Sequence, residues 1–224
     1  MIDKRVGSLA EALDGIADGV RLMISGFGGA GFPTALVRAL EASTVSDIRL
    51  VSNTLRIIQD HAPGLFAPGR IRDVICSSAR SRGPDTSDFE HRLLSGELPI
   101  ELVPQGTFAE RLRAGGAGIP AFYTPTGVGT RLTEGKEVRA FDGRDYVMER
   151  AITADYALIR GHRADRWGNV VFHGTQANFG PAMAAAATVT VVEVERIEDK
   201  PLDPHCIHIP GIHVQRLIEA ADER

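Results

Sequence analysis

The chain has 224 residues, of which 43% are hydrophobic, and a formal net charge of −4 at pH 7. Its Lys and Arg residues are scattered rather than gathered in a basic stripe, and no apolar stretch reaches the length of a membrane span, so neither a nucleic acid nor a membrane is an expected partner. The only cysteines, Cys76 and Cys206, lie far apart, which favours a reducing compartment over a disulfide scaffold. We therefore expect one cytoplasmic domain spanning residues 1–224.

Strand and helix patterns alternate along the chain. Ser8 and Glu11 form a capping box at the start of a first helix, and Thr107 and Glu110 form a second one. Strands are predicted at 20–25, 48–52, 71–77, 99–103, 119–123, 155–160 and 187–194, and further helices at 33–42, 86–94, 107–113, 176–185 and 212–220. This order predicts an α/β fold, an open and mostly parallel sheet with helices on both faces, with a small β-rich excursion at 116–150.

The first predicted strand ends in a loop that has almost no side chains. Gly26, Gly28, Gly29 and Gly31 lie in this loop, and Pro33 then opens a helix. Such a loop lets a ligand approach the backbone closely and offers it amide donors. The sequence therefore predicts that something slender or anionic binds here.

One interpretation of the loop is dinucleotide binding, because Gly26, Gly28 and Gly31 satisfy the G-x-G-x-x-G fingerprint. That fingerprint also needs an acidic residue at the end of the second strand to hold the ribose. The second strand instead ends in Ser52 and Asn53, and Asp47 lies before it. The second strand therefore disfavours a nicotinamide or flavin dinucleotide.

The second interpretation comes from a resemblance. Asp18–Pro33 resembles the first signature of the family I CoA-transferases, in which an Asp-Gly or Asn-Gly pair and apolar residues precede G-G-F, three residues and G-x-P. Ser25 departs from it by replacing the first of the paired glycines. Later segments extend the resemblance to the A (alpha) subunit of a 3-oxoacid CoA-transferase of the succinyl-CoA, acetate or 3-oxoadipate type: Gly96–Arg113, Gly116–Thr130, Phe141–Arg150, Trp167–Phe172 and Ala177–Pro181.

The resemblance implies a reaction that this chain cannot complete alone. Family members use a glutamate that attacks an acyl-CoA and becomes a glutamyl-CoA thioester, with ping-pong kinetics. That glutamate lies in an S-E-N-G signature on the B (beta) subunit, and S-E-N-G is absent from this sequence. The expected partners are thus a B subunit, in a heterodimer or heterotetramer, together with acyl-CoA and a carboxylate as substrates. CoA is a substrate, and no cofactor is expected.

The resemblance also implies roles for individual residues. Gln105 matches a glutamine that lies beside the nucleophile and orients it, and Asn53 matches the first residue of an Asn-Asn pair next to the site, with Thr54 in place of the second. The backbone of one loop would contact CoA or its acyl group: Ser25, Gly26, Phe27, Gly28, Gly29, Ala30 and Gly31. Plainer roles stay open, namely a tight turn for the glycines, a helix cap for Gln105 and a left-handed turn for Asn53.

These candidate residues fall on turns that we expect at one rim of the sheet, beyond the carboxyl ends of the strands: Ser25–Gly31, Ser52–Thr54 and Pro104–Gly106. Arg80 and Arg82 are expected to face solvent, with contact to an anionic substrate as the alternative. A metal site is disfavoured because His205 and Cys206 are adjacent and would point to opposite sides of an extended chain. The rival function is a sensor or binding module, since sugar-phosphate regulators and isomerases share this sheet architecture.

Overall fold

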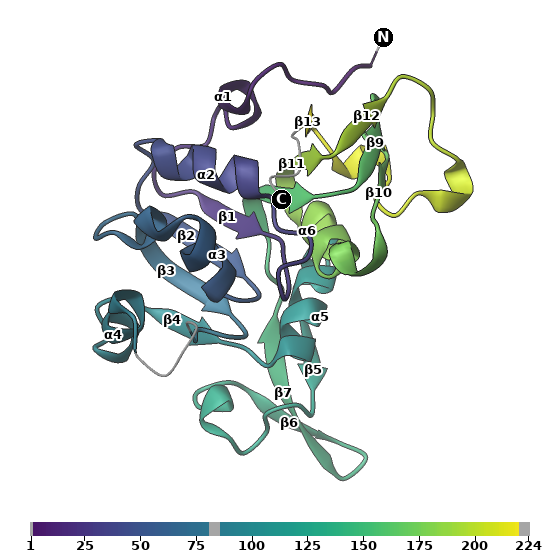
Figure 1. Cartoon of the computed structure of the whole chain (residues 1–224). Coiled ribbons are helices and arrows are strands. Elements are labelled where there is room, and N and C mark those ends of the chain that lie inside the picture. The colour runs from purple at the N-terminus through teal and green to yellow at the C-terminus, as the bar shows by residue number, and fades with distance from the viewer. Residues whose placement is uncertain (1, 81–85, 220–224) are drawn as a thin grey trace.

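Short apolar strands build the centre of the molecule. The computed structural model describes residues 2–80 and 86–219. Seven strands form one sheet in the order β13-β11-β8-β1-β2-β3-β4, and every neighbouring pair is parallel (Figure 1). Their bounds are β1 Arg21–Ile24, β2 Ile48–Ser52, β3 Ile71–Cys76, β4 Ile100–Leu102, β8 Ala154–Arg160, β11 Ala187–Val194 and β13 Arg216–Glu219.

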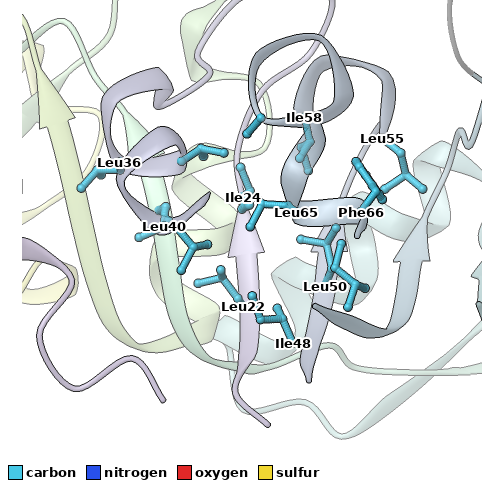
Figure 2. Packing of buried hydrophobic residues seen from close by; sticks show 14 of the residues in the cluster. Leu22, Ile24, Leu36, Leu40, Ile48, Leu50, Leu55, Ile58, Leu65 and Phe66 are labelled. Atoms are coloured by element: carbon cyan, nitrogen blue, oxygen red, sulfur yellow. The ribbon is translucent and has the colours of Figure 1, made fainter. Parts of the chain in front are cut away.

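Helices cover both faces of this sheet, as the sequence predicts. Alternate residues of each strand point to opposite faces, so Leu22 and Ile24 of β1 join one core cluster while Met23 joins the other. Figure 2 shows the first cluster, in which Leu22 and Ile24 lie beside Leu36 and Leu40. The helices of this face are α1 Leu9–Ala12, α2 Thr34–Ala42, α3 Arg56–His61 and α4 Asp88–Leu94; the other face carries α5 Gln105–Gly116 and α6 Gly180–Ala186.

The predicted β-rich excursion is present as a separate antiparallel sheet, which projects from the end of α5 (Figure 1). Its strands, in the order β5-β7-β6, are β5 Ala121–Thr124, β6 Val138–Phe141 and β7 Arg144–Arg150. Arg111 of α5 anchors it by donating from Nε to the Arg150 carbonyl at 2.6 Å. A third sheet has the order β10-β9-β12 and consists of β9 Arg163–Asp165, β10 Val170–Val171 and β12 Arg196–Glu198.

The helix predicted at 212–220 is wrong. A 3₁₀ turn, η5 Gly211–His213, is followed by strand β13. The spacing of Val214, Leu217 and Ile218 fits either state, and pairing at the sheet edge decides between them. Leu217 lies opposite Val192 of β11, is fully buried, and donates its amide to the Lys4 carbonyl at 2.8 Å.

Two local predictions around the candidate site also differ from the structure. α5 begins at Gln105 rather than Thr107, so Thr107 is a buried residue inside the helix and caps nothing. The stretch after Asn53 contains helix α3, which the sequence pattern did not predict and which buries Ile57 and Ile58. Half of the first capping box is confirmed, because the Ser8 hydroxyl accepts a hydrogen bond from the Glu11 amide at 3.1 Å. The Glu11 side chain accepts from the Gly7 amide at 2.8 Å rather than from the Ser8 amide.

The described residues also form short 3₁₀ helices: η1 Pro63–Phe66, η2 Arg131–Thr133, η3 Gly174–Ala177 and η4 Pro204–Cys206. Across the residues that the structure describes, none of the helices combines the length and apolar character that crossing a membrane requires.

Candidate functional site

The strand order of the sheet reverses between β1 and β8. From β1 the chain adds β2, β3 and β4 on one side, whereas β8, β11 and β13 lie on the other. Open parallel sheets bind ligands at the carboxyl ends of the strands at such a switch point. The loop after β1 and the turn after β2 leave the sheet there side by side, because Ile24 lies opposite Ser52 in the register.

The loop after β1 is a small hairpin with an open tip. Phe27 and Ala30 exchange backbone hydrogen bonds of 3.0 Å, and Gly28 and Gly29 between them have φ values of 59° and 92°. A positive φ at both central residues is the requirement of a type I′ turn and favours glycine. A Cβ at either glycine would meet no atom within 4 Å apart from its chain neighbours, so the tip has space around it. None of the backbone hydrogen bonds among the described residues uses the two tip amides.

The base of the loop is fixed. Ser25 is 1% exposed, and its hydroxyl donates to the Gly31 carbonyl at 2.7 Å and accepts from the Arg160 amide at 3.3 Å. A second glycine in place of Ser25 would lack both bonds. The departure at Ser25 from the family signature therefore closes the loop at its base while the Gly28–Gly29 tip stays open.

The amino end of α2 is already occupied by a carboxylate. Glu193 of β11 accepts a hydrogen bond from the Leu36 amide at 2.9 Å, and its carboxylate thus takes the position that a bound phosphate would need at this helix end. Dinucleotide binding places the pyrophosphate at the helix that follows the first strand. The geometry therefore argues against that interpretation and leaves the tip of the loop as the place for an incoming ligand.

Asn53 and Gln105 come together beside this loop. The Asn53 side-chain oxygen accepts from the Ser77 hydroxyl at 2.6 Å and from the Gln105 side-chain amide at 3.2 Å. Asn53 is 1% exposed at the end of β2, whereas Gln105 is exposed at the start of α5. Neither plainer role holds, since Asn53 is outside the left-handed region and Gln105 donates to Asn53 rather than capping a helix. The turns after β2 and β4 thus meet through this hydrogen bond, and the loop after β1 leaves the same edge of the sheet.

A buried ion pair that the sequence did not predict lies under the loop. Arg160 at the end of β8 and Glu193 of β11 are 5% and 2% exposed, and their charged groups lie 2.6 Å apart. Burial raises the pKa of Glu193, while hydrogen bonds from Leu36 and Arg160 act in the opposite direction. Glu195 extends the network by accepting from Gln176 at 3.4 Å and contacting His162 at 3.0 Å. The sequence held one signal for this pair, because Arg160 and Glu193 each place a charged residue at an inward position of an otherwise apolar strand.

The other polar candidates do not join this site. His208 accepts from the Phe172 amide at 3.2 Å, and within residues 2–80 and 86–219 no group of three or more His, Cys, Asp or Glu could hold a metal ion. Arg80 lies 3.7 Å from Glu90, and Arg82 lies outside the described residues. Burial raises the pKa of the Cys76 thiol to about 12, so it is an ordinary core residue.

Known proteins resemble this chain over nearly its whole length. A family model described as Coenzyme A transferase matches residues 6–220. The chain is 48% identical over 217 residues to the A subunit of the succinyl-CoA:3-ketoacid coenzyme A transferase of Xanthomonas campestris pv. campestris (strain B100), and the match covers 96% of this chain and 88% of that relative. It is 43% identical over 219 residues to the A subunit of the 3-oxoadipate CoA-transferase of Pseudomonas putida, with 97% and 94% covered.

The fold also matches a solved structure. The crystal structure of glutaconate coenzyme A-transferase from Acidaminococcus fermentans aligns with a TM-score of 0.84 at 22% identity, covering 97% of this chain and 76% of that one. The family match over residues 6–220 and the relatives above 40% identity decide the assignment. The chain belongs to the coenzyme A transferase family.

Proposed function

We propose that this chain is the A subunit of a two-subunit CoA-transferase, which moves CoA between an acyl-CoA and a short-chain carboxylate or 3-oxoacid. The observation that carries the proposal is the open Gly28–Gly29 tip in the loop after β1 together with the Asn53–Gln105 pair, at the same carboxyl edge of the parallel sheet. The relatives, which are named as A subunits, support a heteromeric assembly, for which we propose a heterodimer or heterotetramer in the cytoplasm. Residues 1–224 act in it as one domain.

The nucleophilic glutamate comes from the partner. Among the described residues, Glu193 is the buried carboxylate nearest to the loop in the hydrogen-bond network, but it is 2% exposed and held by Arg160 and the Leu36 amide. It cannot reach a thioester without breaking both contacts. Since the sequence also lacks the S-E-N-G signature, a B subunit supplies the attacking carboxylate.

The reaction needs only carboxylate and thiolate chemistry. The partner glutamate attacks the thioester carbonyl, the C–S bond breaks, and CoA thiolate leaves an acyl-glutamyl anhydride. The thiolate then attacks the glutamyl carbonyl, which forms the glutamyl-CoA thioester and releases the first carboxylate. A second carboxylate then attacks the glutamyl-CoA, and the same steps in reverse form the new acyl-CoA and regenerate the glutamate. CoA enters as a substrate, and no cofactor is required.

Each part of the site on this chain has a role in these steps. Gln105 is a neutral donor, so it can orient the glutamate without adding charge. Its own orientation is set by Asn53, which Ser77 holds in place. Among the described residues, the tip amides of Gly28 and Gly29 take part in no backbone hydrogen bond, and an added Cβ at either glycine would meet open space, so these amides can donate to the carbonyl oxygen or to CoA.

The need for a second subunit gives a direct test. We expect the purified chain to show no transferase turnover with any acyl-CoA and carboxylate pair, and a B-type partner to restore turnover on mixing. Trapping with hydroxylamine should place the thioester on the B-type partner. Turnover by the isolated chain would disprove the proposal, as would binding of a phosphosugar in preference to CoA by the assembled pair.

Gln105→Ala should slow chemistry more than it weakens binding. The change removes one hydrogen bond to a charged carboxylate, about 1.5–3 kcal/mol, so we expect kcat to fall roughly 10- to 100-fold with little change in KM. Gln215→Ala is the control, because that side chain bonds the Thr190 amide at 2.7 Å within the sheet. If Gln105→Ala forms the glutamyl-CoA intermediate at the normal rate, the orienting role is wrong.

A further inference from the structure

The far arm of the glycine loop, Ala30 and Gly31, is held in place by a residue to which the proposed function assigns no role. Asn178 lies between η3 and α6, and its side-chain nitrogen donates to the Ala30 carbonyl at 3.1 Å. The same nitrogen donates to the carbonyls of Gln176 at 3.0 Å and Thr175 at 3.3 Å. The Asn178 side-chain oxygen accepts from the Phe179 amide at 2.7 Å. One side-chain amide therefore joins the loop to η3 and to the start of α6.

The backbone at Asn178 is unusual. Its φ is 23° and its ψ is −110°, which few residues other than glycine adopt. The surrounding bonds hold the residue in this conformation, and such outliers cluster at functional sites. This strained backbone conformation points the Asn178 side chain at the glycine loop, where it bonds the Ala30 carbonyl.

Gly31 explains why the two segments can lie so close. A Cβ at Gly31 would sit 2.3 Å from the Gln176 carbonyl oxygen and 2.7 Å from the Asn178 side-chain nitrogen. The glycine therefore permits the contact that Asn178 then secures. At Gly28 and Gly29, in contrast, a Cβ would meet no such neighbour, so the segment after β10 approaches only the arm of the loop.

We propose that Asn178 is a positioning residue that fixes the glycine loop in the conformation that receives acyl-CoA. Two bonds hold consecutive carbonyls of the far arm, Asn178 on Ala30 and Ser25 on Gly31. Because the far arm is held at both carbonyls, the tip amides keep one orientation before the substrate binds. Substrate binding therefore does not have to order the loop. The proposal rests on the proposed function, because it assumes that the tip contacts acyl-CoA.

The role separates Asn178 from Gln105 kinetically. A loop that must be ordered by the substrate weakens binding, so the loss of Asn178 raises KM for acyl-CoA. Gln105 acts on the partner glutamate and changes kcat instead. Asn178→Asp is the sharper variant, because Asp keeps the acceptor for the Phe179 amide and tolerates positive φ but turns the donor into an acceptor that faces three carbonyls.

The experiment uses the assembled two-subunit enzyme with Asn178→Asp and Asn178→Gly. The control is Asn169→Ala, which removes a similar clamp, between Asp165 and the Gly211 amide, from another part of the chain. Steady-state kinetics, thermal midpoints and amide hydrogen exchange of residues 26–31 are measured without and with acyl-CoA. We expect both Asn178 variants to raise KM for acyl-CoA about 10-fold with kcat within about threefold, and to speed exchange in the free enzyme.

The outcomes are distinct. Unchanged exchange at 26–31 overturns the proposal, as does faster exchange with an unchanged KM, since the loop would then be looser without effect on binding. A fall in midpoint and kcat that Asn169→Ala reproduces also overturns it, because Asn178 would then be structural only. If the wild-type two-subunit enzyme shows no transferase activity, the proposed function fails. A normal rate of hydrogen exchange in the Asn178 variants would separately reject the positioning role of Asn178.

Discussion

Gly28→Val and Gly29→Val should each lower acyl-CoA turnover of the assembled enzyme by at least about 100-fold, or roughly 2.7 kcal/mol of transition-state stabilisation. The reason is the geometry of the tip, where two positive φ values turn the backbone and an added Cβ would have no atom within 4 Å apart from its chain neighbours. The space around the tip is therefore available to the substrate or the partner. A valine side chain would fill that space and turn the tip amides away.

The folded chain itself should tolerate these substitutions. A β-branched residue at positive φ costs roughly 1–3 kcal/mol, which lowers the thermal midpoint by several degrees without unfolding the chain. Steady-state turnover and thermal melting of the co-purified pair measure both effects.

Gly69→Val is the matched control. Gly69 has a φ of 82° and, like the tip glycines, no atom within 4 Å of an added Cβ, but it lies in the turn before β3. It should lose similar stability and keep normal turnover. If Gly28→Val and Gly29→Val match Gly69→Val in turnover, the glycine loop does not belong to the active site.

The contrast between β11 and β13 shows how far the sequence predicts the fold. The run 187–194 predicts a strand correctly, because its many β-branched residues carry the signal within the segment. The last strand does not carry such a signal. Leu217 becomes part of a strand because β11 on one side and Lys4 on the other supply its partners, and those lie far away in the sequence.

The candidate site shows the same division. Asn53 and Gln105 could be selected one by one from their place in turns and from the family resemblance. Their hydrogen bond could not be predicted, because it needs α5 to start at Gln105 and Ser77 to hold Asn53 from the end of β3. Asn178 lies in a segment that supported the resemblance, but its backbone conformation is visible only in three dimensions.

The Arg160–Glu193 pair is the extreme case, because its partners are separated by 33 residues and meet only when β8 and β11 become neighbours. Arg160 also donates its backbone amide to Ser25, and Glu193 caps α2, so the pair joins the base of the glycine loop to the helix that follows it. The ion pair therefore supports the glycine loop from buried positions in the sheet.

Glu193→Ala should destabilise the chain by about 3–5 kcal/mol, because it removes the nearest carboxylate from a buried guanidinium and the acceptor from the Leu36 amide. The control is Glu198→Ala, which breaks the 2.7 Å pair with Arg163 where both side chains are partly exposed, 41% and 26%. Such a pair contributes about 1 kcal/mol or less. Chemical denaturation of the two variants beside the wild type measures the difference.

A double replacement distinguishes the loss of an ion pair from the loss of packing. Replacing both partners by apolar residues, Arg160→Met with Glu193→Leu, removes the unpaired charge, so the double variant should be more stable than Glu193→Ala alone. Equal loss of stability in Glu193→Ala and Glu198→Ala would contradict the buried pair as a support of the site. Because Arg160 donates to Ser25 at the base of the loop, Glu193→Ala should also speed hydrogen exchange at Ser25 and Gly31. Glu198→Ala should leave exchange at those amides unchanged, since its partner Arg163 does not connect to the loop.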